Sequence, residues 1–168
     1  LRDAWRREKC DMPLKVALIG CGNISSRHLE AYERINGVSV DCVADIDVSR
    51  AKATAERYGI PRAVSTVEEA LEGSVIDFVD VCTPAFAHRD VVITAAQAGK
   101  HVVCEKPLAL TGSDALEMTE ACRQADVKLM VAFRHRFTRW ASIVRERMLR
   151  GDLGRPIIWR EVLASSGP

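Results

Sequence analysis

Short runs of branched aliphatic residues alternate with helix-like segments along most of this sequence, and that alternation restricts the folds open to it. The strand-like runs are LKVALIG (14–20), VSVDCVAD (38–45), a short run near Ala63-Val64, VIDFVDVCT (75–83), HVVCE (101–105) and VKLMVAF (127–133). Strands that alternate with helices at this spacing form βαβ units, and right-handed crossovers then produce a parallel sheet. We therefore predict an α/β fold with a doubly wound parallel sheet and helices on both faces.

The segments between these runs have helical composition. We expect helices at residues 23–35, 49–58, 67–71, 87–98 and 113–125. Glycine closes the second and fourth of them, and it is a common helix cap because it adopts a left-handed backbone without steric cost. Beyond Phe133 the pattern changes to a basic amphipathic helix, RHRFTRWASIVRERMLRGDLG, followed by the start of another strand.

Composition argues against several classes of protein. Of the 168 residues 48% are hydrophobic and the net charge is +1, which fits neither a disordered chain nor a nucleic-acid-binding surface. The apolar runs are too short to cross a bilayer, and the first residues do not form a secretory signal. The six cysteines are scattered without a metal-binding cluster, so we expect reduced core residues in a cytoplasmic protein and no metal site.

The stretch IGCGNISSRH (19–28) follows the first strand and has the spacing of a dinucleotide-binding loop. In such a loop the first glycine makes the turn, the second lets the backbone approach a pyrophosphate, and the third lets helix and strand pack closely. Gly20 and Gly22 match the first two positions, whereas Ser25 replaces the third glycine. Amides at a helix N-terminus still point at an anion, so we predict pyrophosphate binding. A glycine turn of purely structural origin is the alternative.

Asp45 ends the second strand 25 residues after Gly20, where a carboxylate can accept hydrogen bonds from the ribose hydroxyls of the cofactor. A carboxylate there would repel a 2'-phosphate, so we predict NAD rather than NADP. Arg50 lies close enough in the sequence to keep NADP open. Asp47 is a less well-placed rival, and a solvated turn residue is the structural alternative for Asp45.

Two more strand ends carry polar or reactive residues. In VDVCTPAFAH and KHVVCEKPLAL these are Thr83, Pro84, His88, Glu105 and Lys106. Ligands of open parallel sheets bind at the carboxyl ends of the strands, so we expect these residues on the same edge as the glycine loop. Taken alone, Glu105-Lys106 is better explained as a surface charge pair before a proline turn.

Five segments in this order and spacing resemble a single family: IGCGNISSRH, VADID, VDVCTPAFAHRD, AGKHVVCEKPLAL and VAFRHRF. They are similar to the oxidoreductases named for glucose-fructose oxidoreductase, inositol dehydrogenase and rhizopine catabolism (Gfo/Idh/MocA), over residues 14 to about 160. The resemblance implies a Rossmann NAD(P)-binding domain at residues 13–133, after an extension at 1–12. At 134–168 it implies the first helix and strand of a truncated α/β domain for substrate binding and oligomerisation.

The resemblance also implies a role for each candidate site residue. These are Gly20, Gly22, Asn23 and Ile24 at the pyrophosphate, Asp45 at the ribose, Thr83, Pro84 and His88 at the nicotinamide side, Glu105 and Lys106 at the nicotinamide and substrate, and Arg134 and Arg136 near the substrate pocket. A lysine beside a carboxylate can donate a hydrogen bond to a substrate hydroxyl and stabilise the developing alkoxide. For the two arginines, a solvated basic helix start fits at least as well.

The predicted function is NAD-dependent hydride transfer to or from a secondary alcohol of a sugar, cyclitol or related polyol. The resemblance implies a homo-oligomer, and we expect no nucleic-acid or membrane partner. In the family, an aspartate and a histidine of the following domain help with acid-base catalysis, and neither is assigned here, so whether this chain is itself an enzyme stays open. The alternatives are a non-catalytic NAD(P)-binding or sensing protein and an NAD-dependent glycosidase-like relative.

Overall fold

The structure is a computed structural model that describes residues 13–73, 75–155 and 157. Its residues divide into two units, one up to Ala132 and one from Phe133. In chain order the first unit contains β1 (Leu14–Ile19), α1 (Ser25–Tyr32), β2 (Val38–Ala44), α2 (Val48–Tyr58), β3 (Arg62–Val64), α3 (Val67–Leu71), β4 (Phe78–Val81), the 3-10 helix η1 (Ala85–Ala87), α4 (His88–Gln97), β5 (His101–Cys104), α5 (Gly112–Gln124) and β6 (Leu129–Val131).

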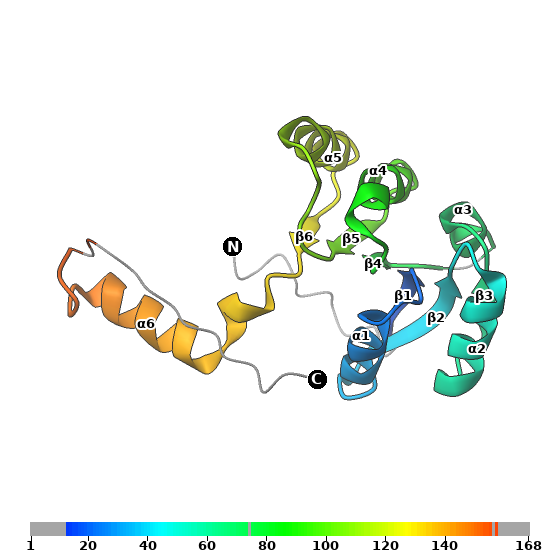
Figure 1. Cartoon of the computed structure of the whole chain (residues 1–168), viewed down its shortest axis with the longest axis horizontal. Coiled ribbons are helices and arrows are strands. Elements are labelled where there is room, and N and C mark those ends of the chain that lie inside the picture. The colour runs from blue at the N-terminus through cyan, green and yellow to red at the C-terminus, as the bar shows by residue number, and fades with distance from the viewer. Residues whose placement is uncertain (1–12, 74, 156, 158–168) are drawn as a thin grey trace. The chain divides into compact units, whose positions relative to one another are not determined.

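The strands of the first unit form one six-stranded sheet in the order β3-β2-β1-β4-β5-β6 (Figure 1). Every neighbouring pair is parallel, which confirms the predicted doubly wound sheet. The chain moves outward from β1 through β2 to β3 and then returns to place β4 on the other side of β1. The strand order therefore reverses between β1 and β4, and ligands of such sheets bind at this reversal.

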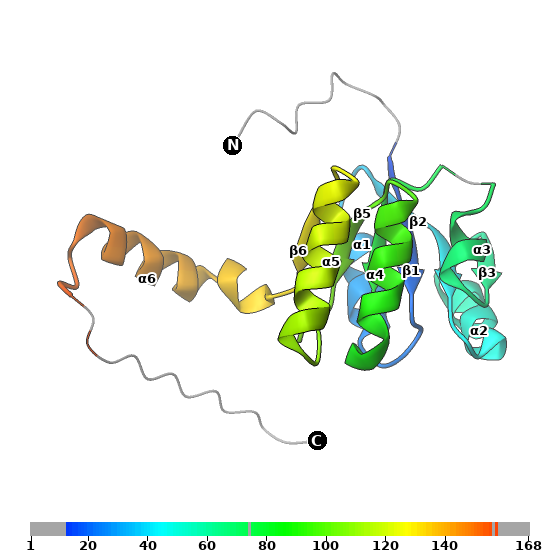
Figure 2. The same ribbon diagram turned by 90° about the horizontal axis from the view of Figure 1, so that it is seen from above.

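Helices cover both faces of the sheet (Figures 1 and 2). Residues of α3, α4 and α5 pack on one face, and residues of α1 and α2 pack on the other. Successive side chains of a strand point to opposite faces, so Ala17 and Ile19 of β1 join the first core and Leu18 joins the second. All three are buried, as expected for a central strand of a parallel sheet.

The predicted helices and strands of the first unit are all present, but several are shorter than expected. β4 covers four residues instead of the predicted 75–83, because its paired register with β1 spans only Phe78–Val81. Helix α1 begins at Ser25 rather than at residue 23, because the Ser25 amide and hydroxyl both bond to the Gly22 carbonyl in a preceding turn. The predicted glycine cap after α2 is confirmed, with Gly59 at φ 65°.

The second unit contains η2 (Arg134–Phe137) and α6 (Arg139–Arg150), which ends at Gly151 with φ 80°. This confirms a basic helix in that region, divided into two elements. Exposed apolar side chains of α6 are Trp140, Ile143, Met148 and Leu149. The extension at 1–12 lies outside the described residues, and so does the strand expected from residue 155 onward, except for residues 155 and 157.

Five cysteines of the described ranges, Cys21, Cys42, Cys82, Cys104 and Cys122, are buried and free. The prediction of reduced core residues is thus confirmed for them, whereas Cys10 lies outside the described residues. Burial raises the pKa of Cys21 to about 11 and that of Cys104 to about 12, so these thiols stay protonated and unreactive at neutral pH. Within the described part of the chain, none of the helices has both the length and the apolar character that crossing a membrane requires.

Candidate functional site

The glycine loop after β1 packs directly against the end of β4. Gly20 has φ +96°, and a β-carbon built on it would lie 2.7 Å from the Thr83 nitrogen and 2.8 Å from the Cys82 carbonyl carbon. Only glycine fits this backbone and this approach. A β-carbon on Gly22 would meet nothing within 4 Å. The space beside Gly22 is therefore open, as a loop that receives a pyrophosphate requires.

Ser25, which replaces the third glycine of the fingerprint, is 3% exposed. Its hydroxyl donates to the Gly22 carbonyl at 2.6 Å, so the side chain folds back onto the loop. Ile24 occupies the N-cap of α1 and provides no side-chain cap. Asn23 is exposed beside it. No side chain caps the start of α1: the amides of Ser25 and Arg27 bond to the backbone carbonyls of Gly22 and Ile24, and an anion beside the loop would be a further acceptor.

Asp45 connects the end of β2 to the glycine loop. Its Oδ2 accepts a hydrogen bond from the Cys21 amide at 2.8 Å, and its Oδ1 accepts one from the Asp47 amide at 2.9 Å. The Arg50 guanidinium lies 3.6 Å from Oδ2. At 8% exposure Asp45 is not a solvated turn residue. Each carboxylate oxygen has a further lone pair, so ribose hydroxyls can still donate to it.

Asp47, the alternative candidate for the ribose-binding carboxylate, has a different structural role. It is the N-cap of α2, and its carboxylate accepts hydrogen bonds from the amides of Ser49 and Arg50. Aspartate is among the best residues for this position. The local geometry therefore separates the two carboxylates, one at the glycine loop and one at a helix start.

The segment after β4 carries a hydroxyl without a partner. Thr83 Oγ1 is buried and makes no hydrogen bond in the structure, and Pro84 next to it is exposed. A buried hydroxyl without a partner is uncommon and suits a position where a ligand supplies the missing bond. Together with the room beside Gly22, this atom fits a polar cofactor at the edge.

His88 is 1% exposed and joins two strand-end segments. Its Nε2 lies 2.9 Å from the Thr83 carbonyl oxygen, and its Nδ1 lies 3.0 Å from that of Pro107 and 3.1 Å from that of Leu108. These contacts place His88 behind the edge. There it holds the segments after β4 and β5 against each other.

Glu105 and Lys106 follow β5 and point to different environments. Glu105 is 9% exposed, and its amide donates to the Val81 carbonyl at 3.0 Å, which extends the pairing of β4 and β5. Its Oε2 accepts a hydrogen bond from the Lys106 amide at 2.9 Å. Lys106 is exposed, and the peptide bond between Lys106 and Pro107 is cis. The burial of Glu105 does not fit a surface charge pair.

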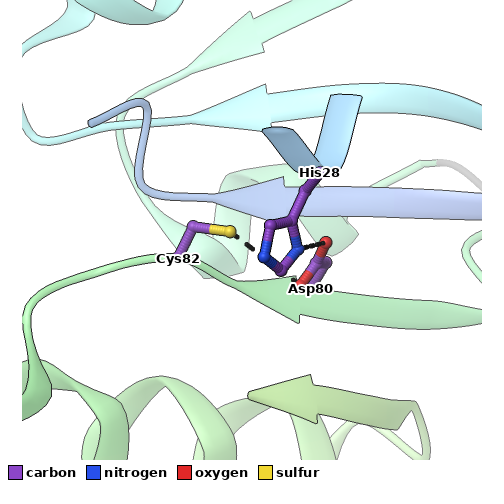
Figure 3. A group of neighbouring side chains, drawn as sticks. All are labelled: His28, Asp80 and Cys82. Atoms are coloured by element: carbon purple, nitrogen blue, oxygen red, sulfur yellow. Dashed lines mark hydrogen bonds and ion pairs between the residues drawn. The ribbon is translucent and has the colours of Figure 1, made fainter. Parts of the chain in front are cut away.

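Sequence reasoning missed a polar cluster beneath this edge, formed by His28, Tyr32, Asp80, Cys82 and Glu105. His28 Nδ1 lies 2.8 Å from Asp80 Oδ2, and His28 Nε2 lies 3.2 Å from Glu105 Oε1. Figure 3 shows His28, Asp80 and Cys82 of this cluster. The Tyr32 hydroxyl donates to the same Asp80 oxygen at 2.8 Å. Two signals could have found the cluster: an aspartate inside an apolar strand, and two polar residues four apart on one helix face.

The cluster changes the acidity of its members. The hydrogen bond to Asp80 raises the pKa of His28, although burial acts in the opposite direction. Burial, strengthened by the nearby Asp80 carboxylate, raises the pKa of both Tyr32 and Cys82. The tyrosine and the thiol are therefore protonated at neutral pH, and the histidine keeps its proton to a higher pH than an unperturbed imidazole does.

The structure brings most of the predicted site residues to the carboxyl ends of β1, β2, β4 and β5. These are Gly20, Gly22, Asn23, Ile24, Asp45, Thr83, Pro84, Glu105 and Lys106, with His88 behind them. Arg134 and Arg136 belong to η2 of the second unit, where both are exposed.

Residues 14–133 match the model of the Gfo/Idh/MocA family, described as an oxidoreductase family with an NAD-binding Rossmann fold. The chain belongs to this family. The Gfo/Idh/MocA match covers the whole six-stranded sheet, so the predicted Rossmann fold and its NAD-binding character are confirmed.

Known Gfo/Idh/MocA proteins resemble this chain over most of its length. A D-apiose dehydrogenase from Paraburkholderia graminis is 41% identical over 151 residues, which are 88% of this chain and 39% of that protein. A myo-inositol 2-dehydrogenase from Thermotoga maritima is 33% identical and covers 88% of this chain and 44% of its own length. The chain thus spans about two fifths of these relatives.

A solved structure shows the same architecture. The WlbA dehydrogenase from Bordetella pertussis, in complex with NADH and UDP-GlcNAcA, superposes with a TM-score of 0.82 at 29% identity. The match covers 86% of this chain and 42% of that chain.

Proposed function

We propose that this chain is the cofactor-binding part of an NAD-dependent oxidoreductase that moves hydride between nicotinamide and a secondary alcohol of a sugar, cyclitol or related polyol. One observation carries the proposal. Four features lie together at the carboxyl edge of one parallel sheet: the open glycine loop, the buried Asp45 carboxylate, the unpartnered Thr83 hydroxyl and the exposed Lys106.

The glycine loop and the first amides of α1 would receive the pyrophosphate, with Gly20 and Gly22 keeping the backbone close and open. Asp45 would accept hydrogen bonds from the adenosine ribose, since its oxygens retain lone pairs beyond the two amides that they bind. Thr83 and Pro84 would line the nicotinamide side, and His88 would support them through the Thr83 carbonyl. The carboxylate favours NAD, whereas Arg50 at 3.6 Å reduces its repulsion of a 2'-phosphate.

Lys106 would orient and polarise the substrate. Its exposed ammonium can donate a hydrogen bond to a substrate hydroxyl and stabilise negative charge that develops on that oxygen. Glu105 fixes the backbone from which Lys106 projects, because its carboxylate binds the Lys106 amide. When bound, NAD supplies the hydride acceptor for the neighbouring carbon.

The substrate class follows from the relatives, which include apiose and inositol dehydrogenases. We extend the proposal to Arg134 and Arg136 as residues near the substrate, to residues 134–168 as the start of a substrate and oligomerisation domain, and to a cytoplasmic homo-oligomer without nucleic-acid or membrane partners.

Isothermal titration of the purified chain with NAD and NADH tests the proposal, together with an assay of NADH formation against a panel of polyols. Asp45→Ala should weaken NAD binding by about tenfold or more, because a charged hydrogen-bond acceptor is lost. Lys106→Ala should change the affinity by less than about threefold and remove any turnover. Equal losses of affinity in both variants, or no binding by the wild-type chain, would contradict the proposal.

A further inference from the structure

His28 lies between two carboxylates, one from β4 and one from the segment that follows β5. It projects from α1 onto β4, toward Asp80 and beside Cys82 (Figure 3). Asp80 has a fully buried side chain, whereas the side chains of His28 and Glu105 are 16% and 12% exposed. The ring therefore connects the interior of the sheet with the carboxyl edge where Glu105 begins the segment after β5.

Both ring nitrogens of His28 face carboxylate oxygens, at 2.8 Å and 3.2 Å. A neutral imidazole carries a proton on one nitrogen only. Its other nitrogen would have no proton to donate and would face a carboxylate oxygen, which is also an acceptor. The protonated ring donates from both. Its positive charge also offsets two carboxylates that would otherwise be held close together in a largely buried place.

Glu105 is held at both of its oxygens. Oε1 faces the His28 ring, and Oε2 accepts the hydrogen bond from the Lys106 amide at 2.9 Å. The direction of the Lys106 backbone therefore depends on where the Glu105 carboxylate is held. The cluster also contains two other titratable groups, Tyr32 of α1 and Cys82 just after β4, which lie 2.8 Å and 3.9 Å from Asp80 oxygens. The Cys104 thiol of β5 interacts electrostatically with both Asp80 and Glu105.

We infer that His28 is a positioning residue, whose doubly hydrogen-bonded ring holds Glu105 toward Asp80 and thereby fixes the Lys106 backbone at the edge of the sheet. The inference rests on the proposed function of Glu105 and Lys106. Helix α1 starts directly after the glycine loop, so the helix that would present amides to the pyrophosphate also carries this ring. His28 thus links the cofactor-binding loop to the segment that would act on the substrate.

A metal ion is the other arrangement that these residue types allow. His28, Asp80 and Cys82 can each offer one ligand atom, and these atoms lie within 4.8 Å of one another. Both nitrogens of His28 are already paired with carboxylates, however, and burial keeps the Cys82 thiol protonated. A metal would need a deprotonated thiol and a free imidazole nitrogen. The hydrogen-bonded arrangement needs neither change.

Nitrogen NMR of the 168-residue chain with labelled histidine tests the inference, because ring nitrogen shifts report protonation directly. We expect protons on both His28 nitrogens at about pH 7, a midpoint above the ordinary value of about 6.5, and a Lys106 amide resonance that titrates with the same midpoint. His28→Gln identifies the ring signals and should abolish that titration of the Lys106 amide. Glu105→Gln should lower the His28 midpoint. His135→Gln, at an exposed position, is the matched control and should leave the Lys106 amide unchanged.

A neutral His28 ring at about pH 7, or a Lys106 amide that does not respond to its titration, would overturn the inference. Loss of the His28 ring protons on addition of Zn²⁺ would overturn it in favour of a metal site. If His28→Gln fails to fold, sequential assignment of the wild-type chain identifies the same ring and amide signals, and the wild-type spectra then decide these points. Titration of the wild-type chain with NAD is a separate readout: no binding would defeat the proposed function, whereas the protonation of His28 would still be measured.

Discussion

The backbone of Gly20 lies so close to that of Thr83 that a β-carbon on Gly20 would come within 2.7 Å of the Thr83 nitrogen. The contact joins the ends of β1 and β4, the two strands between which the order of the sheet reverses. A ligand at this edge therefore meets a loop whose position is set by backbone packing. Side chains then determine what the loop can bind.

Gly20→Ala should lower the free energy of unfolding by about 3 kcal/mol, because alanine is strained at this φ and its methyl group would displace backbone atoms of Cys82 and Thr83 just after β4. Gly22→Ala is the matched control. It should cost less than about 1 kcal/mol in stability, since nothing lies near its β-carbon, yet it should weaken NAD binding by filling the open space. Urea denaturation and calorimetric titration measure the two effects. Equal destabilisation by both variants would refute this assignment.

Asp45→Asn should reduce both stability and the preference for NAD. An asparagine oxygen can replace only one of the two carboxylate oxygens that accept from Cys21 and Asp47, so one amide loses its partner at a cost of about 1–3 kcal/mol. The ratio of the NADP to NAD dissociation constants should fall, because the charge that repels a 2'-phosphate is gone. Asp47→Asn should change neither quantity, since asparagine caps helices as well as aspartate does. Tighter binding of NADP than NAD by the wild type would contradict the reasoning.

Thr83→Val should separate stability from binding. Valine has the shape of threonine without the unpartnered hydroxyl, so the free energy of unfolding should stay within about 1 kcal/mol of the wild type or rise. NAD affinity should fall by about five- to tenfold if the hydroxyl binds the cofactor. Thr119→Val, on the exposed side of α5, should leave NAD binding unchanged. Unaltered affinity in Thr83→Val would remove this residue from the site.

His88→Ala should destabilise the first unit by about 2–4 kcal/mol, because it leaves a cavity and removes the ring hydrogen bonding that joins the segments after β4 and β5. His88→Gln keeps an amide donor and should cost less. His135→Ala, at an exposed position in η2, should change the free energy of unfolding by less than about 0.5 kcal/mol. Thermal unfolding followed by circular dichroism compares the three variants. A His88→Ala variant as stable as the wild type would show that the ring does not hold these segments together.

His28 should make stability depend on pH. Its pKa is raised in the folded chain, so the stabilisation is fully present below the unfolded value of about 6.5 and is lost as the pH rises through the folded midpoint. The free energy of unfolding, measured in urea at a series of pH values, should therefore decline over this range. His28→Gln should flatten the decline. A stability curve that is identical in wild type and variant would argue against a protonated His28.

Much of the fold was predictable because a strand in a parallel sheet is buried on both faces and reads as a continuous apolar run. The element ends were less accurate. Apolar character extends over residues 75–83, whereas β4 ends at Val81 because the strand beside it turns away at Gly20. Strand length depends on the partner, and the partner is not visible in local sequence.

The candidate site was also predictable only in part. The spacing of Gly20, Gly22 and Asp45 already indicated a nucleotide-binding edge, because loop turns and the strand ends beside them are local features. The separate tasks of Asp45 and Asp47 were not visible in the sequence, since both stand in one short acidic segment. Only their bonding partners tell them apart.

By itself the sequence determined the alternation of strands and helices, the parallel sheet and the edge at which polar residues gather, because these follow from periodicity and chain direction. Only the tertiary structure decided that His28 lies between Asp80 and Glu105, residues 52 and 77 positions away, and that His88 is enclosed by backbone carbonyls. Hydrogen bonds between distant segments depend on how helices pack across strands, and that packing brings together residues that no local pattern connects.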